Sequence, residues 1–129
     1  MNIDGPDFPS HQLVPVITQD AASGAVLMLA YMNQEAYAET LRTRRVCYYS
    51  RSRQKLWRKG EESGHVQNLR QIFYDCDADT LLVKVEQVGD AACHEGYQSC
   101  FFREIDPGTG SSRIIAQQVF DPATVYKSS

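Results

Sequence analysis

The acidic hexapeptide DCDADT (75–80) holds the side chains whose types and spacing most directly indicate chemistry. Asp75, Asp77 and Asp79 alternate along the chain, and the thiol of Cys76 stands between the first two carboxylates. Carboxylate oxygens are hard ligands that suit magnesium, whereas a thiolate is a soft ligand that suits zinc. In an extended strand the three aspartates share one face and Cys76 points to the other. We therefore predict that the carboxylates and the thiol serve different metals.

The reach of a fully extended chain limits how these aspartates can act together. Asp75 and Asp79 would stand about 13 Å apart at roughly 3.3 Å per residue, too far for one cation to bridge. Either the chain bends at 78–80, or only two aspartates bind directly; an acidic hairpin turn in solvent without a metal is a further alternative. A calcium EF-hand is rejected because Thr80 stands where its loop needs glycine, and 81–88 alternates like a strand.

The cysteines form a second candidate metal site. Cys93 and Cys100 lie seven residues apart and Cys76 precedes them, but no C-x-x-C pair exists, so the spacing differs from that of a zinc finger. Three thiolates with one open position would make a catalytic zinc site, because the open position can hold a water molecule. Four protein ligands would make a structural site instead. Cys47, in VCYYS (46–50), is predicted to be a core residue.

Histidines and a basic run supply the other candidate site residues. His94 directly follows Cys93, so it would lie near a zinc-activated water, and either His94 or His65 could carry protons. The segment SRSRQKLWRKGEESGH (50–65) concentrates positive charge that suits phosphate groups, with an indole that could stack on a base, although a solvated basic loop would look similar. The predicted substrate-binding residues are Ser50, Arg51, Arg53, Trp57, Lys59, Ser63 and Gly64.

Composition excludes several classes of protein. The chain has 129 residues, of which 43% are hydrophobic and 22% charged, which indicates one folded domain spanning 1–129. A net charge of −3 argues against a dedicated nucleic-acid or membrane-binding protein. The longest apolar run, 25–32, is too short to cross a bilayer, and the N-terminus has no secretion signal. We expect a cytoplasmic protein.

The pattern of elements predicts an α+β fold of mostly antiparallel strands with one main helix. A helix should begin after the cap Asn33 and end near Arg44, with Ala36, Tyr37, Thr40 and Leu41 on its apolar face. Strands are expected at 13–18 (with Pro15 in an edge strand), 26–32, 46–50, 65–75 and 80–88, the last two forming a hairpin; 51–64 and 89–100 should be loops, 107–112 a turn, and 113–120 either strand or helix.

Three stretches, YYSRSRQKLWRKGEESGH, DCDADTLL and ACHEGYQSCFFR, closely resemble the phosphoribosyl-AMP cyclohydrolases of histidine biosynthesis over about residues 12–104. Glu62 and Glu95 stand where the family usually has threonine. The resemblance implies a homodimer with metal sites at the subunit interface. Cys93 and Cys100 would bind zinc together with Cys76 of the partner subunit, and the three aspartates would bind magnesium.

The reaction that this resemblance implies opens the adenine ring of phosphoribosyl-AMP by adding water at C6 and breaking the N1–C6 bond. About 25 residues follow the matching region, so we expect a monofunctional enzyme without a pyrophosphohydrolase domain. A zinc-dependent nucleotide deaminase is a rival, but its H-x-E and P-C-x-x-C signature is absent. A non-enzymatic dimer held together by structural zinc is a second rival, which an exchangeable water at zinc would exclude.

Overall fold

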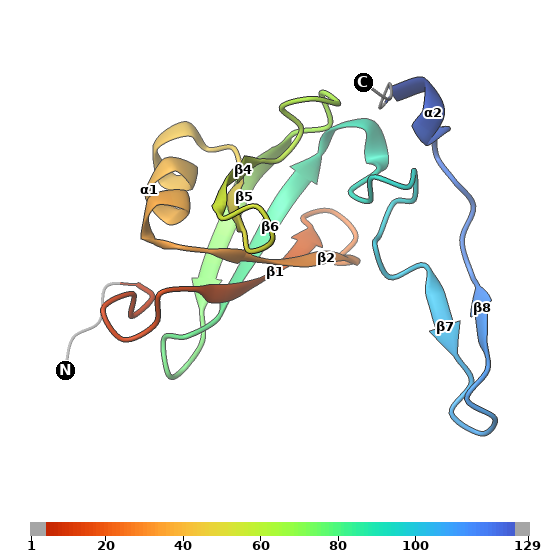
Figure 1. Cartoon of the computed structure of the whole chain (residues 1–129), viewed down its shortest axis with the longest axis horizontal. Helices are drawn as coiled ribbons and strands as arrows, with labels where there is room; N and C mark the ends of the chain where they lie inside the picture. Colours follow the sequence, from red (N-terminus) through yellow and green to blue (C-terminus); the bar gives the residue numbers. More distant parts are fainter. Residues whose placement is uncertain (1–4, 126–129) are drawn as a thin grey trace.

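The computed structural model describes residues 5–125. Its central element is a four-stranded sheet (Figure 1). The predicted domain spans 1–129, but its ends, 1–4 and 126–129, lie outside the described residues. The prediction that the N-terminus carries no secretion signal also falls partly on residues 1–4. The elements are β1 (Val14–Asp20), β2 (Val26–Met32), α1 (Gln34–Thr43), β3 (Cys47–Ser50), β4 (Lys55–Arg58), β5 (Gln67–Tyr74), β6 (Leu81–Gln87), the 3-10 turn η1 (Val88–Asp90), β7 (Arg103–Ile105), β8 (Ser112–Ile114) and α2 (Pro122–Val125).

The sheet has the strand order β2-β1-β6-β5, and two further hairpins pair β3 with β4 and β7 with β8. All pairs are antiparallel except β1 and β6, which run parallel. The predicted α+β class, with mostly antiparallel strands and one main helix, is confirmed. The predicted hairpin of 65–75 with 80–88 is also confirmed as β5 and β6. The β7–β8 hairpin projects away from the sheet (Figure 1).

The prediction that Pro15 lies in an edge strand is wrong, because β1 is an interior strand between β2 and β6. Pro15 pairs with Tyr31 of β2, but the parallel pairing with β6 begins only at Val16. The missing N–H of Pro15 therefore removes no bond to β6, and the proline is tolerated at the start of the strand.

The main helix begins and ends as predicted. The Asn33 side chain accepts a hydrogen bond from the Ala36 N–H at 2.8 Å, and Arg44 closes the helix in the left-handed conformation with φ 62°. Ala36 and Thr40 are buried, but Leu41 is 42% exposed and was wrongly placed on the apolar face. Among the described residues no helix is both long and apolar enough to cross a membrane.

The predicted loop 51–64 is partly wrong, because it contains β4, which pairs with β3. Trp57 lies opposite Tyr48 in this hairpin, and their rings are 5.4 Å apart. The charged neighbours of Leu56 and Trp57 hid the alternation that marks a strand. The segment 113–120 is a strand only at its start, where it contributes to β8.

A chain of buried polar side chains crosses the core. The hydroxyls of Thr18 and Tyr48 are 2.7 Å apart, and Tyr48 donates to Oε1 of Gln67 at 2.6 Å. Gln67 donates to Gln87 at 2.8 Å, and Gln87 donates to the carbonyl of His65 at 2.9 Å. Since buried polar groups are costly unless paired, this network fixes β1, β3, β5 and β6 relative to one another.

Tyr48→Phe is therefore expected to destabilise the protein by about 1–3 kcal/mol, since it leaves Gln67 Oε1 and the Thr18 hydroxyl without their shared partner. Urea unfolding monitored by circular dichroism measures the difference. Tyr49→Phe, a change of the same kind one residue along β3 and outside the network, is the matched control. Equal losses in the two variants would contradict the importance of the network.

Candidate functional site

The acidic hexapeptide forms the turn between β5 and β6, and this turn brings its three carboxylates together. One oxygen each from Asp75, Asp77 and Asp79 lies within 4.8 Å of the others, so the chain bends, as the first alternative required. Ala78 makes the bend with φ 61° and is buried. The idea that Cys76 occupies an opposite strand face is wrong, because the segment is not extended: the Cys76 thiol lies 3.6 Å from Oδ1 of Asp77.

Hydrogen bonds and charge give the aspartates different acidities. Partial desolvation opposes ionisation of Asp75, but the N–H groups of Asp79 and Thr80 donate to its Oδ1 at 3.1 and 3.2 Å and lower its pKa. Desolvation and the neighbouring Asp75 and Asp77 carboxylates raise the pKa of Asp79. A bound cation would offset the repulsion between these close carboxylates, and hard oxygen ligands fit magnesium.

Cys93 and Cys100 form a thiol pair in the loop that follows η1. A tight turn holds Cys93, whose N–H donates to the Tyr97 carbonyl at 3.1 Å. The N–H of Cys100 donates to the Leu27 carbonyl at 2.7 Å, which fastens this loop to β2. Partial burial and, after it, the neighbouring Cys93 thiol together raise the pKa of Cys100 to about 12. Two adjacent soft ligands of this kind fit zinc.

The third predicted zinc ligand does not join this pair within the chain. Among residues 5–125, the acidic cluster is the only group of at least three His, Cys, Asp or Glu side chains with ligand atoms in mutual reach. Cys93 and Cys100 therefore have no third ligand from the described part of their own chain. Cys76 is exposed on the β5–β6 turn, beside the carboxylates.

Lys59, which the sequence predicted to bind substrate in a basic loop, lies in the interior. It is only 6% exposed, and its Nζ donates to the carbonyl of Ala92, next to Cys93. Burial lowers the pKa of Lys59, while the nearby Cys100 and Cys93 act in the opposite direction. The structure thus places a cation beside the thiol pair.

The other predicted substrate-binding residues lie on the β3–β4 hairpin and the loop after it. Arg51 and Arg53 are exposed at the hairpin turn, where the Ser50 hydroxyl accepts the Arg53 N–H at 3.3 Å. The guanidinium of Arg51 lies 4.0 Å from the centre of the Tyr31 ring. Trp57 is 40% exposed, so part of its indole is free to stack on a ligand.

The loop after β4 brings the remaining polar candidates toward the thiol loop. The Ser63 hydroxyl accepts the His65 N–H at 3.1 Å, and Gly64 adopts φ 81°. The His65 ring packs edge-on against Phe120 with centroids 4.9 Å apart, and its buried Nδ1 has no hydrogen-bond partner among the described residues. A Cβ atom at Gly89 would lie 2.5 Å from His65 Cδ2, so the ring needs glycine there.

The two candidate proton carriers differ in exposure. His94 is exposed on the turn after Cys93, whereas His65 is partly buried. A C-terminal segment that was not predicted to be part of the site covers this region: the Gln118 side chain donates to the Glu95 carbonyl at 2.9 Å, and the Val119 N–H donates to the Gly96 carbonyl at 2.6 Å. The apolar pair Val119–Phe120 within a polar stretch was the available signal.

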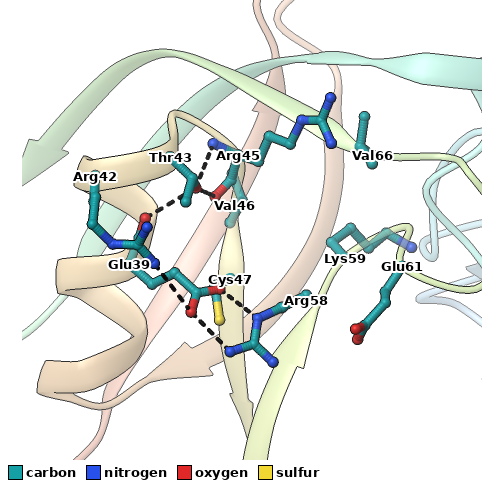
Figure 2. A pocket seen from close by; sticks show the side chains of 10 residues that line it. All are labelled: Glu39, Arg42, Thr43, Arg45, Val46, Cys47, Arg58, Lys59, Glu61 and Val66. Carbon is teal, nitrogen blue, oxygen red and sulfur yellow. Dashed lines mark hydrogen bonds and ion pairs between the residues drawn. The ribbon is translucent and has the colours of Figure 1, made fainter.

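A separate cavity of about 660 Å³ lies between α1 and the β3–β4 hairpin (Figure 2). Glu39 and Arg58 face each other there in a two-pronged ion pair at 2.7 and 2.9 Å. Of the predicted site residues, only Lys59 lines it. Burial, followed by the Glu39 charge, raises the pKa of Cys47 to about 12. Cys47 is thus a protonated core thiol, as predicted, and this cavity is distinct from both metal-ligand groups.

Comparison with known proteins gives a consistent result. A family model described as phosphoribosyl-AMP cyclohydrolase matches residues 28–102. A phosphoribosyl-AMP cyclohydrolase of Desulforapulum autotrophicum is 57% identical over 115 residues, which cover 89% of this chain and 91% of the relative. A phosphoribosyl-AMP cyclohydrolase of Oleidesulfovibrio alaskensis is 53% identical, and the alignment covers 98% of this chain and 100% of the relative. A third, from Haloquadratum walsbyi, is 56% identical, and the alignment covers 93% of this chain and 86% of the relative.

The buried Cys47 thiol should make the stability of the protein depend on pH. Because its folded-state pKa of about 12 exceeds the ordinary 9.0, its stabilising contribution is present below pH 9 and is lost as the pH rises toward 12. The free energy of unfolding of metal-stripped protein should therefore fall across this range, and less steeply in Cys47→Ala. Urea unfolding at stepped pH measures the slope. Cys76→Ala, which removes an exposed thiol, is the control, and an unchanged slope in Cys47→Ala would refute the assignment.

Proposed function

This chain belongs to the phosphoribosyl-AMP cyclohydrolase family, and on that premise we propose that it opens the adenine ring of phosphoribosyl-AMP in histidine biosynthesis. Water adds at C6, the N1–C6 bond breaks, and the product is an aminoimidazole carboxamide ribotide with a formimino-linked phosphoribosyl group. The observation that carries the proposal is the adjacent thiol pair Cys93 and Cys100, next to the exposed His94, in a chain of this family.

Zinc is the cofactor we propose for the thiols. Zinc bound there would supply a water molecule whose pKa is lowered toward ~7. Cys93 and Cys100 hold two positions from one loop, and Lys59 fixes that loop through the Ala92 carbonyl while its positive charge offsets the negative thiolates. The buried placement of Cys93 also limits competition from bulk solvent.

We propose that magnesium and the basic hairpin bind the substrate phosphates. Asp75, Asp77 and Asp79 offer clustered oxygens to magnesium, which needs few protein ligands when phosphates complete its shell. Arg51 and Arg53 stand exposed on the hairpin turn, as phosphate ligands must. Holding both phosphates would orient the purine for attack at C6. Trp57 offers a partly exposed face for stacking.

Proton transfer is assigned to His94 or His65. His94 is exposed beside Cys93, where it could take a proton from the attacking water and return it to N1 as the ring opens. His65 is less accessible, since its ring is packed against Phe120 and Gly89. That difference favours His94 as the group that moves the proton and His65 as a residue that shapes the site.

The proposal includes a homodimer in which each zinc site is shared. Cys93 and Cys100 of one subunit would be joined by Cys76 of the partner subunit. The separation of Cys76 from the thiol pair within the described chain supports this arrangement. It also accounts for cysteine spacing that resembles no single-chain zinc motif.

An absorbance assay of purified protein with phosphoribosyl-AMP, zinc and magnesium tests the function. We expect ring-opened product, and its loss on addition of a chelator. Cys93→Ser should lose zinc and activity together, whereas His94→Ala should keep zinc and lose about 10²–10⁴-fold in turnover. A zinc-loaded, folded wild-type protein that makes no product would favour a structural zinc site, and near-normal turnover of His94→Ala would remove His94 from the mechanism.

Mixing two inactive variants tests the shared zinc site. A mixed dimer of Cys76→Ser with Cys93→Ser retains one complete site, because the intact Cys93 and Cys100 of one subunit meet the intact Cys76 of the other. After denaturation and refolding together, random pairing makes about half of the dimers mixed, so zinc content and activity should return to roughly a quarter of the wild-type level. Cys93→Ser refolded with Cys100→Ser is the control, because no pairing restores a site. Equal results from the two mixtures would contradict a shared site.

A further inference from the structure

After the β7–β8 hairpin the chain returns to the thiol loop. The N–H of Ile115, just after β8, donates to the carbonyl of Phe102, just before β7, at 2.9 Å. This bond closes the excursion of the hairpin at the end of the thiol loop. Residues 118–120, which we call the strap, then bind the turn of residues 93–96. The hairpin therefore delivers the strap to the candidate site.

The turn that the strap contacts carries His94. The N–H of Gly96 donates to the Cys93 carbonyl at 3.0 Å, so His94 and Glu95 are the two central residues of the turn. His94 is exposed, so the backbone of the turn, rather than packing of the ring, sets where the imidazole lies. Whatever fixes this turn also fixes the position of the candidate proton carrier.

The strap binds the turn through two of its backbone carbonyls. The Gln118 side chain donates to the Glu95 carbonyl at 2.9 Å. The Gly96 carbonyl accepts the Val119 N–H at 2.6 Å and the Phe120 N–H at 3.4 Å. A Cβ atom at Gly96 would clash with the Phe120 carbonyl, so the close approach of the two segments requires glycine. Val119 is 51% exposed, so these bonds, and not burial of its side chain, join the strap to the turn.

The strap also contacts the second candidate proton carrier. The Phe120 ring lies edge-on against the His65 ring, with centroids 4.9 Å apart. The backbone of His65 is held by the Gln87 amide, which donates to its carbonyl at 2.9 Å, and Gly89 leaves the space that its ring occupies. The strap therefore contacts the turn of one candidate histidine and the ring of the other.

We propose that the strap consists of positioning residues for the ring-opening reaction. It holds the turn so that His94 keeps a fixed place beside Cys93, and it keeps the His65 ring seated. A proton carrier works only within hydrogen-bond reach of its target, and a displacement of about 1 Å can cost roughly 10²-fold in rate. The strap acts through the histidines rather than on the substrate. Its effect on turnover rests on the proposed function, whereas its hold on the turn rests on the contacts alone.

Gln118→Ala/Phe120→Ala tests the strap, with Ile115→Ala/Gln117→Ala as the matched control. The control removes the same kinds of side chain from the same segment, since Ile115 is 54% exposed and Gln117 is exposed, but it leaves the strap unaltered. The strap variant should lower kcat about 10–100-fold with KM and zinc content unchanged, and the control should keep the wild-type kcat. If circular dichroism shows that the strap variant does not fold, Gln118→Ala with Gln117→Ala as control carries the same test.

The same substitutions in a His94→Ala background separate positioning from a general structural role. A structural role would lower turnover equally whether or not the imidazole is present. A positioning role predicts less than about a 2-fold further loss in this background, because the group that the strap holds is missing. An equal loss in both backgrounds, or equal kcat of the strap and control variants, would overturn the positioning role.

Amide hydrogen exchange measures the hold on the turn without the reaction. The N–H groups of Cys93 and Gly96 donate to the carbonyls of Tyr97 and Cys93, so their exchange reports how firmly the turn is held. In the full chain with zinc and magnesium, exchange at these two amides should be at least about 10-fold faster in the strap variant than in its control. Equal exchange would overturn the hold, even in an active enzyme. Faster exchange in a protein that opens no ring would retain the hold and reject only the proposed function.

Discussion

The buried hydrogen-bond chain from Thr18 to the His65 carbonyl is the constraint on which the arrangement of the site depends. It links side chains of β1, β3, β5 and β6 in the core, where an unpaired polar atom is costly. Its last member, Gln87, also donates to the carbonyl of Val88, at the start of the loop that carries Cys93. The network therefore fixes the start of the thiol loop and the loop of His65 with the same set of bonds.

The two groups of candidate ligands are held in place in different ways, one local and one long-range. A left-handed residue, Ala78, lets a six-residue turn gather three carboxylates that an extended strand would keep apart. The thiol loop instead relies on long-range bonds, from Cys100 to Leu27 and from Lys59 to Ala92. The acidic cluster is thus set by its own sequence, whereas the thiol pair depends on β2 and β4 being in place.

This difference explains how much the sequence could predict. The Asn33 cap, the strand at 26–32 and the hairpin around 75–80 have local signals, and the structure has them all. The bend in the acidic turn could only be offered as one alternative, since alternation alone does not distinguish a turn from a strand. The interior position of Pro15 and the burial of Lys59 depend on pairing between distant segments, and no periodicity in the sequence encodes that pairing.

Separate placement of the soft ligands has a consequence for the energetics of the proposed enzyme. If zinc is held by thiols of two subunits, binding of the metal and association of the chains are coupled, and each must strengthen the other by the same factor. Zinc then stabilises the dimer by mass action, and dilution to monomer weakens the metal site. Any association energy that is independent of the metal would leave less of the binding free energy of zinc to be spent on bringing two chains together.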